Sequence, residues 1–370
     1  MAATTPGESK GKNQGNEKRL RVAVLFGGRS PEHDVSILSA TNVVRALDSD
    51  RYDVVPIFVT KDGQWRMVPA NMDLSAAGNA PGLPQLSLLP GGRGRLFAIP
   101  DTGAASELSA IDVLFPVLHG MHGEDGSVQG LAEVARVPLA GCGILGSATA
   151  IDKDIAKRLL REAGMPVATS VCIEEPDSPS FEEAVAKLGL PLFVKPARQG
   201  SSVGVSKVTN EEEFTAALAE GFKYDRKLLA EEFIRGREVE CSVLERASGE
   251  LFVSLPGEIA PSAHHGFYSY DAKYIDEDGA SLRVPAQLPK DVEDKIRETA
   301  NLAFKALGCD GMARVDFFLT EDMSFVVNEI NTIPGFTDIS MYSKAMAASG
   351  VSYAEVIDRL IEHALARANR

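Results

Sequence analysis

Apolar residues recur along the chain in short continuous runs near the amino end. Such runs are typical of strands buried on both faces of a parallel sheet. A helical period follows the first run at residues 35–47, and Ser30 and Pro31 stand where an N-cap and first helical residue are favoured. A strand, a glycine turn and a helix predict a doubly wound, Rossmann-like unit. The apolar runs are residues 21–26, 54–60 and 111–118.

Two segments near this unit are not expected to supply catalytic or binding residues. Residues 70–110 are rich in Gly, Pro and Ser, which predicts a loop-rich insertion. Residues 141–146 match the glycine spacing of a dinucleotide-binding turn, but Pro138 interrupts the preceding strand and no suitably placed acidic residue follows. We therefore interpret them as a tight turn between domains.

The middle of the chain alternates helical and strand patterns. Helices are predicted at residues 152–164 and 181–188, and a buried strand ends at Lys195. A glycine-serine loop and a second strand at residues 204–207 follow. Small residues let backbone N–H groups close over phosphate oxygens beside a lysine charge, although a plain hairpin turn has the same pattern.

Residues 227–234 form another predicted strand that carries acidic side chains. Strand backbone groups commonly bind adenine and a nearby carboxylate binds ribose, so this strand is a candidate nucleotide site. An edge strand with surface charges is the alternative. Irregularly spaced aromatic residues at 264–274 then predict a long functional loop, consistent with a lid over phosphates. The candidate nucleotide contacts are Glu231, Glu232, Ile234 and Glu238.

A hairpin is predicted from residues 313–319 and 325–330, separated by the polar turn 321–324. With that loop, Asp316 lies opposite Glu329 and Arg314 lies opposite Asn331, with Cβ atoms roughly 4.5–5.5 Å apart. Two carboxylates at this spacing repel each other unless a cation lies between them. Oxygen ligands of this kind suit Mg²⁺, and magnesium implies a nucleotide. A polar, solvated outer face is the alternative.

Two helices flank this hairpin in the sequence. A helix at residues 291–307 ends at Gly308, and an amphipathic helix with a capping box at Ser352 and Glu355 closes the chain.

Polar residues also follow the amino-terminal strands. Glu32, in the first turn of the predicted helix, either balances the helix dipole or binds a ligand. His119 begins a glycine-rich loop at the carboxyl end of a strand, where open α/β sheets bind ligands. We interpret His119 as a polar contact in a cleft, because no further histidine or cysteine nearby completes a zinc site.

Composition narrows the classes of function. The chain has 370 residues, enough for two or three domains, and a net charge of −14, which argues against nucleic acid as a partner. Four cysteines without a CxxC pair indicate reduced thiols and a cytosolic setting. No stretch is long enough to predict a membrane span, and residues 1–20 are predicted to be a disordered leader.

The chain contains, in this order, the motifs GGRSPEHDVS, HGMHGEDGSVQG, DKDIAKRLLREAGMP, VKPARQGSSVGV, EEFIRGREVE, YDAKY, ARVDFFL and NEINTIPGFTDIS. Together they resemble the D-alanine:D-alanine ligases of the ATP-grasp superfamily. The resemblance implies a mixed α/β chain with an ATP-grasp fold behind a Rossmann-like preATP-grasp domain. The implied parts are the leader, an amino-terminal domain at 21–140, a central subdomain at 141–234 and a carboxyl-terminal subdomain at 235–370.

The resemblance also implies a two-step reaction. ATP phosphorylates the carboxylate of one D-alanine, and the amine of a second D-alanine attacks the acyl phosphate. Magnesium or manganese, as two ions, would accompany ATP. A homodimer in the cytoplasm, with neither nucleic acid nor membrane as partner, is expected.

Residue roles follow from matching the motifs. The implied catalytic residues are Glu32, Ser201, Tyr274, Arg314 and Gly335. The implied ATP contacts are Lys153, Lys195, Ser202, Glu231, Glu232, Ile234, Glu238 and Lys273. The implied substrate contacts are His119, Ser340 and Met341, and the implied metal ligands are Asp316, Glu329 and Asn331.

Two alternatives stay open at this point. One is a related ligase that makes D-alanyl-D-lactate or D-alanyl-D-serine; Tyr274 after Lys273 favours the D-alanine dipeptide. The other is a nucleotide-binding paralogue without catalysis, for which we would expect a replacement among Arg314, Asp316, Glu329 and Asn331.

Overall fold

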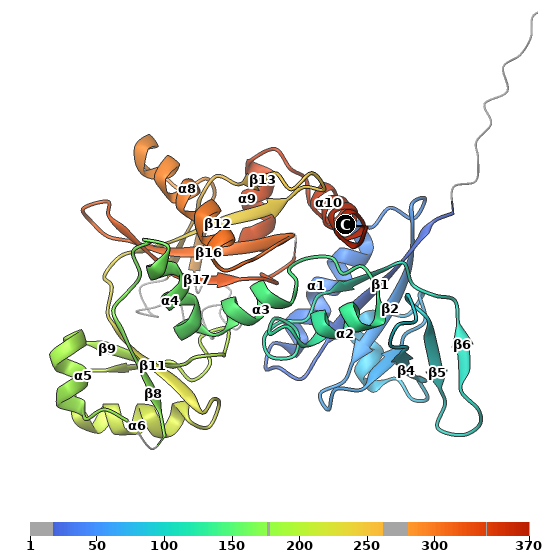
Figure 1. Cartoon of the computed structure of the whole chain (residues 1–370), viewed down its shortest axis with the longest axis horizontal. Coiled ribbons are helices and arrows are strands. Elements are labelled where there is room, and N and C mark those ends of the chain that lie inside the picture. The colour runs from blue at the N-terminus through green and yellow to red at the C-terminus, as the bar shows by residue number, and fades with distance from the viewer. Residues whose placement is uncertain (1–17, 176–177, 262–279, 338, 370) are drawn as a thin grey trace, which may run out of the picture.

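The computed structural model describes residues 18–175, 178–261, 280–337 and 339–369. Within them lie a seven-stranded, a four-stranded and a six-stranded sheet, with helices packed around them (Figure 1). The seven-stranded sheet forms one lobe. The other two sheets form a second lobe, and the cavity described below lies between them.

The amino-terminal sheet is built around strand β1 (Leu20–Gly27), which pairs in parallel with β2 (Tyr52–Val59) and β7 (Val113–Pro116). Alternate residues of β1 enter two different cores. Val22 and Val24 pack with helices α1 (His33–Ala46) and α10 (Tyr353–Ala368), and the other face packs on α2 (Ser127–Ala135). The predicted doubly wound unit is therefore present.

The insertion at residues 70–110 is not the loop-rich segment that its composition predicts. It holds the 3₁₀ helix η1 (Leu74–Asn79) and three strands that, with β3 (Trp65–Met67), extend the sheet in the order β6-β5-β4-β3-β2. Leu86 and Leu88 point inward between exposed Gln85 and Ser87, so a strand alternation of four residues was hidden among glycines and prolines. The three strands are β4 (Gln85–Leu88), β5 (Leu96–Ile99) and β6 (Ser106–Leu108).

Two predicted local structures differ in the structure. Helix α1 begins at His33 with Glu32 as its N-cap, because residues 30–32 form a turn in which the His33 N–H donates to the Ser30 carbonyl. The predicted turn at residues 141–146 runs into helix α3 (Ile144–Ile151). A Cβ at Gly146 would lie 2.6 Å from the Cα of Cys309, so this glycine serves close helix packing.

The four-stranded sheet has one apolar face and one polar face. Leu192 and Val194 of β9, with Leu228 and Ala230 of β11, pack on helices α5 (Phe181–Leu188) and α6 (Glu211–Gly221). The intervening residues of both strands face the other way because side chains alternate. The strand order is β10 (Ser206–Val208), β9 (Leu192–Pro196), β11 (Lys227–Glu232) and β8 (Ser170–Glu174).

The six-stranded sheet alternates in the same way. Val239, Cys241 and Val243 of β12 share a core with helices α3, α4 (Lys153–Glu162) and α8 (Lys290–Ala306), while Glu238 and Glu240 face away from it. The strands are β15 (Ala280–Arg283), β14 (Gly257–Pro261), β12 (Arg237–Glu245), β16 (Met312–Leu319) and β17 (Phe325–Asn331), with β13 (Leu251–Val253) paired to β12.

The hairpin of β16 and β17 has the predicted residue pairs, but its loop is longer than predicted and one strand carries a bulge. Asp316 lies opposite Glu329 and Arg314 lies opposite Asn331. The loop, however, is one residue longer than predicted, because Leu319 pairs with Phe325. A bulge at Asn328 then restores the register before the polar residues are reached.

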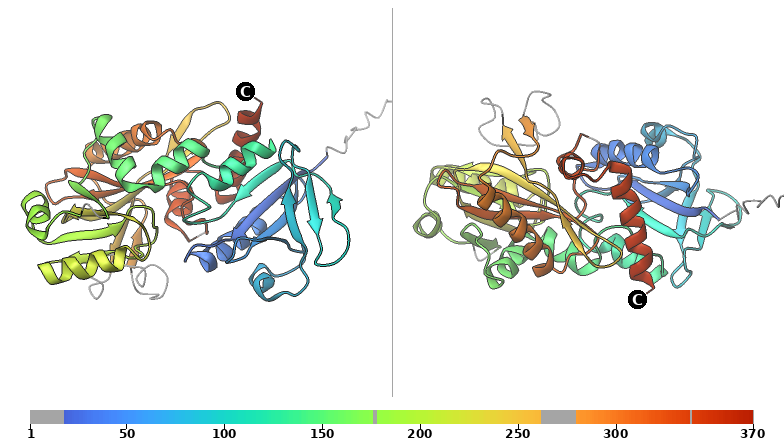
Figure 2. Two further views of the ribbon diagram at one scale, coloured as in Figure 1. Left: turned by 60° about the horizontal axis from the view of Figure 1, so that its bottom comes forward. Right: turned by 90° about the horizontal axis from the view of Figure 1, so that it is seen from above.

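Helix α10 joins the lobes, lying between them in the right-hand view of Figure 2. Its Asp358 pairs with Arg51 at 2.5 Å and accepts from the Tyr52 hydroxyl at 2.8 Å. Ser352 caps the helix as predicted, whereas the Glu355 carboxylate pairs with Arg359. No helix in the described ranges has the length and apolar character that crossing a bilayer requires.

Candidate active site

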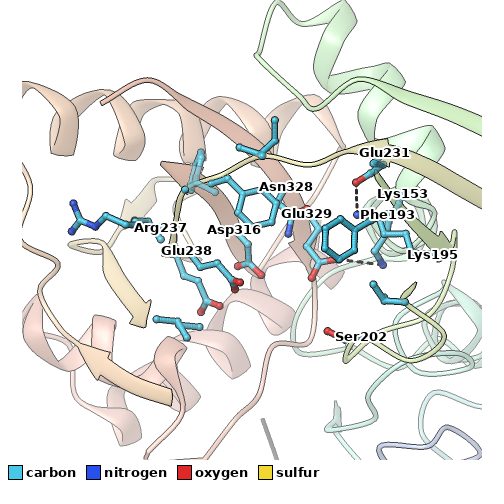
Figure 3. Close-up of a pocket in the computed structure, with 18 of the residues that line it drawn as sticks. Lys153, Phe193, Lys195, Ser202, Glu231, Arg237, Glu238, Asp316, Asn328 and Glu329 are labelled. Atoms are coloured by element: carbon cyan, nitrogen blue, oxygen red, sulfur yellow. Dashed lines mark ion pairs between the residues drawn. The ribbon is translucent and has the colours of Figure 1, made fainter. Parts of the chain in front are cut away.

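A cavity of about 610 Å³ separates the polar faces of the four-stranded and six-stranded sheets (Figure 3). Its walls are the side chains that strand alternation turns away from the two cores. Predicted site residues that line it are the nucleotide and metal contacts Lys153, Lys195, Ser202, Glu231, Glu232, Ile234, Glu238, Asp316 and Glu329, and the catalytic residues Ser201 and Arg314.

Two lysines share one carboxylate on the four-stranded side. Glu231 lies 2.6 Å from Lys195 Nζ and 3.2 Å from Lys157 Nζ. Lys195 lines the cavity, whereas the Lys157 side chain is only 1% exposed and lies beneath it. Burial alone would raise the pKa of Glu231, but the two lysines outweigh it and hold that pKa below its usual value. Burial lowers the pKa of Lys157, which Glu231 offsets in part.

A second group of charges lies on the six-stranded side. The Arg314 guanidinium donates twice to the Asp316 carboxylate, each time at 2.7 Å, and its Nε lies 2.9 Å from Glu240. These carboxylates outweigh the burial of Arg314 and raise its pKa well above the usual value. Asn331 donates to Asp316 at 3.0 Å but does not line the cavity.

Lys153 connects the two sides of the cavity. It is the first residue of α4, and its backbone N–H donates to Ala197 in the loop after β9. Its ammonium donates to the Gln199 carbonyl at 2.7 Å and pairs with Glu329 at 3.3 Å. In Figure 3, Glu329 lies beside Lys153 and Lys195 while Asp316 and Glu238 point into the same space.

The charge of the cavity walls favours a cation. Of the described residues, five basic and seven acidic side chains line it, a formal surplus of two negative charges. A polyphosphate would meet net repulsion there unless it arrived with a metal ion. Asp316 and Glu329 supply carboxylate oxygens on adjacent strands, and Mg²⁺ is usually held by one or two carboxylates plus phosphate oxygens and water. In the described part of the chain, three or more Asp, Glu, His or Cys residues nowhere converge into a protein-only metal cluster.

The far end of the cavity lies where β11 passes into β12. The Glu232 carboxylate accepts the Thr169 N–H at 2.6 Å, so this side chain fixes the edge of its own sheet. Glu258 lies in a 2.8 Å ion pair with Arg237. Ile234 and Glu238 line this end together with the aromatic ring of Phe193.

The glycine-serine loop after β9 reaches the amino-terminal lobe. Ser201 and Ser202 have φ values of 50° and 60°, so two non-glycine residues adopt left-handed backbone here. The Ser201 hydroxyl donates to the Glu32 carboxylate. A Cβ at Gly200 would lie 2.9 Å from the same carboxylate, so a side chain there would press against Glu32.

The other predicted substrate residues lie outside the cavity lining. The His119 ring is buried and bonds the Ile333 carbonyl through Nδ1 at 3.0 Å. Gly335 follows two residues later in the loop after β17. Ser340 is the N-cap of α9 (Met341–Ala348) and its hydroxyl bonds Thr337, while Met341 is buried. Lys273 and Tyr274, and with them the predicted lid, lie outside the described residues.

Sequence reasoning missed three charged residues of the site region. Lys157 was hidden in a helix whose apolar and polar positions fit an ordinary amphipathic pattern. Glu240 follows Glu238 by two residues, a spacing that places both on one face of a strand and could have found it. Glu124 is buried between the Gly120 N–H, at 2.7 Å, and the Ile333 N–H, at 2.9 Å. Its place in a glycine-rich loop after a strand was the available signal.

Comparison with known proteins identifies similar chains over almost the whole length. Residues 21–142 match the family model "D-ala D-ala ligase N-terminus", and residues 159–362 match "D-ala D-ala ligase C-terminus". D-alanine–D-alanine ligase A of Brucella suis is 61% identical over 352 residues, 94% of this chain and 98% of that protein. D-alanine–D-alanine ligase A of Mesorhizobium japonicum is 58% identical over 95% of this chain and 99% of that protein.

Solved structures give the same relationship at lower identity. The D-alanine-D-alanine ligase from Coxiella burnetii has a TM-score of 0.82 and 36% identity, covering 95% of each chain. The VanG D-Ala:D-Ser ligase from Enterococcus faecalis has a TM-score of 0.80 and 36% identity, covering 94% of this chain and all of that one. The Bacillus anthracis D-alanine–D-alanine ligase complexed with ATP has a TM-score of 0.71 and 27% identity, covering 95% of this chain and 99% of that one.

Proposed function

The chain belongs to the D-alanine–D-alanine ligase family, and from this premise we propose a residue-level account of how it joins two D-alanine molecules with ATP. The family makes D-alanyl-D-alanine for peptidoglycan, and its fold is the ATP-grasp fold. The observation that carries the account is the cavity between two sheets, which is lined by both lysines and carboxylates.

ATP is held between the two sheets. Lys153 and Lys195 supply compact positive charge for phosphate oxygens, and Ser202 lies in the loop beside them. The base and ribose occupy the end of the cavity lined by Ile234 and Glu238. Glu231 keeps Lys195 in place rather than binding the nucleotide through its own carboxylate, because both of its oxygens already face lysines.

Asp316 and Glu329, with Asn331 next to Asp316, are the residues that would hold Mg²⁺ or Mn²⁺. A bound divalent ion supplies charge neutralisation to phosphate oxygens and orients them. Arg314 pairs with Asp316 at 2.7 Å, and Lys153 pairs with Glu329 at 3.3 Å. Lys153, which lies between Glu329 and the glycine-serine loop, would contact phosphate oxygens beside the ion that these carboxylates would hold.

The first step makes the D-alanine carboxylate electrophilic. A carboxylate oxygen attacks the γ-phosphorus, the bond from that phosphorus to the bridging oxygen breaks, and ADP leaves. Glu32 is suited to bind the ammonium group of this D-alanine, since it lies beside the glycine-serine loop that closes on the phosphates.

In the second step the deprotonated amine of another D-alanine attacks the acyl carbon. The tetrahedral oxyanion collapses, inorganic phosphate leaves and the nitrogen loses its proton. Arg314 and the Gly335 N–H stabilise the oxyanion in this account, because preorganised donors act where charge develops. Ser340 and the Met341 backbone bind the carboxylate of the second D-alanine.

A D-alanine:D-serine ligase is the second candidate. The observation that favours considering it is the VanG ligase, whose TM-score and identity are close to those of the Coxiella enzyme. The 61% identity to a D-alanine–D-alanine ligase supports D-alanine as the second substrate. We also propose that the enzyme works in the cytoplasm as a homodimer and that ATP is accompanied by two divalent ions.

Turnover with alternative second substrates tests this proposal. ADP release is measured with D-alanine alone and then with D-alanine plus D-serine, and the dipeptides are identified by mass. We expect D-alanyl-D-alanine in both mixtures. Predominant D-alanyl-D-serine in the second mixture would instead assign the second candidate.

A further inference from the structure

The backbone of Ile333 is held at both of its polar groups by one loop of the amino-terminal lobe. The Glu124 carboxyl accepts its N–H at 2.9 Å, and His119 Nδ1 donates to its carbonyl at 3.0 Å. Glu124 and His119 are 8% and 4% exposed, so water competes little for either bond. The two side chains thus form a clamp across the lobes, from the loop after β7 to the loop after β17.

The clamp controls the segment that carries Gly335. Ile333 precedes Pro334, so its backbone is restricted and the proline ring fixes the next φ. Three residues beyond Ile333, the Phe336 carbonyl is held by the Tyr353 hydroxyl at 2.9 Å. Gly335 lies between these two fixed points and is the one residue of 332–337 that is partly exposed. The direction of its N–H therefore depends on how Ile333 is held.

Holding Ile333 with a carboxyl group is costly. Burial, with Glu32 nearby, raises the pKa of Glu124 to about 8, and the two backbone N–H groups and Arg314 oppose this rise only in part. An apolar side chain at this position would avoid the cost but would leave the N–H groups of Gly120 and Ile333 without their acceptor. A carboxyl group accepts both at once, one with each oxygen.

We propose that Glu124, with His119, is a positioning residue that aims the Gly335 N–H at the oxyanion of the ligation step. This inference rests on the proposed function, and it gives His119 a role through the backbone rather than direct contact with substrate. It predicts that losing the clamp lowers kcat while ATP binding, at the other end of the site, is unchanged.

The first test replaces Glu124 by Gln. The carboxamide nitrogen cannot accept, so one of the two N–H groups loses its partner while the volume of the side chain is kept. We expect kcat to fall by about 10- to 100-fold, because small misplacement of a catalytic donor has effects of this size. The Kd of ATP, measured by titration, should stay within about twofold of wild type.

Gln129→Leu is the matched control. Gln129 donates to the Gly123 carbonyl in the same loop at 2.8 Å and is also buried. This variant removes a hydrogen bond of the loop without touching Ile333. We expect a lowered Tm with kcat within about twofold of wild type. A kcat loss in Gln129→Leu as large as in Glu124→Gln would overturn the proposal.

The second test is independent of whether Glu124→Gln folds. His119→Asn keeps a nitrogen donor near the position of Nδ1, whereas His119→Ala removes it. The proposal expects the asparagine variant to recover at least about tenfold in kcat over the alanine variant. Equal kcat for the two variants, or wild-type kcat in Glu124→Gln, would contradict it. Absence of D-alanine turnover by the wild-type enzyme would contradict the proposed function instead.

Discussion

At the scale of single residues, the site depends on lysines and carboxylates that neutralise one another. Lys157 is buried beneath the cavity and shares Glu231 with Lys195. Without Lys157, Glu231 would pair with Lys195 alone. The Lys195 ammonium would then be less available to phosphate oxygens. Lys157, which does not line the cavity, can thus affect the positive charge that Lys195 presents to the ligand.

Lys157→Met tests this arrangement. We expect the Kd of ATP to rise by about tenfold, because one positive charge near the phosphates is lost. The free energy of unfolding should fall by about 3–5 kcal/mol, the usual cost of breaking a buried ion pair. Lys227→Met is the control, since Lys227 pairs with Asp152 and Asp154 outside the cavity lining. It should lower stability while leaving ATP affinity within about twofold.

Asp316→Asn tests the proposed metal ligand. We expect magnesium-dependent ADP release to fall by about 100-fold or more, since the residue would lose metal binding and its bidentate contact with Arg314. Asp322→Asn, in the loop of the same hairpin, should change ADP release by less than about twofold. Equal losses of stability and activity in Asp316→Asn would make Asp316 a structural residue.

The raised pKa of Glu124 predicts that the free energy of unfolding depends on pH in an unusual way. Its pKa in the fold, about 8, lies above the ordinary value of 4.5, so the fold keeps a proton that the unfolded chain releases. This group's contribution to stability therefore falls as pH rises from about 4.5 to 8, by up to about 1.4 kcal/mol per pH unit. Denaturant unfolding of wild type and Glu124→Gln between pH 5 and 8 measures it. The variant should gain relative stability as pH rises; parallel curves would refute this.

At the scale of elements, strand alternation predicted much of the site. The pairs Asp316–Glu329 and Arg314–Asn331 follow from period-two patterning and occur in the structure. The bulge at Asn328 could not be predicted. The extra loop residue shifts the strand pairing by one residue and the bulge shifts it back, so the polar pairs are the same with or without both. The clamp on Ile333 was equally hidden, since it joins loops more than 200 positions apart whose sequences carry no shared pattern.

The glycine-serine loop shows the same limit. Its composition left a phosphate-binding segment and a plain hairpin turn open, and composition alone does not bring Ser201 to Glu32 in another lobe. Ser201→Ala should raise the KM for D-alanine by about tenfold with a smaller change in the Kd of ATP, because it removes the bond between loop and Glu32. Steady-state kinetics and ATP titration measure these two quantities. A rise confined to the Kd of ATP would show that Ser201 serves the nucleotide.

At the scale of the whole molecule, composition predicted the class but not the packing. All four cysteines are free thiols, and three of them are buried. The domain boundaries at residues 140/141 and 234/235 stay predictions. Helices α3 and α4, which fall in the predicted central part, share a core with the six-stranded sheet rather than the four-stranded one. Lys153 on α4 can thereby face Glu329 of one sheet and the loop of the other.

The central claim is that this chain ligates two D-alanine molecules with ATP. The most direct test measures ADP release and dipeptide mass from ATP, magnesium and D-alanine alone, with L-alanine and D-alanine plus D-lactate as comparisons at neutral and alkaline pH. The account predicts one D-alanyl-D-alanine per ADP with D-alanine and no product with L-alanine. No ADP release with D-alanine alone, but turnover once D-lactate is added, would contradict it.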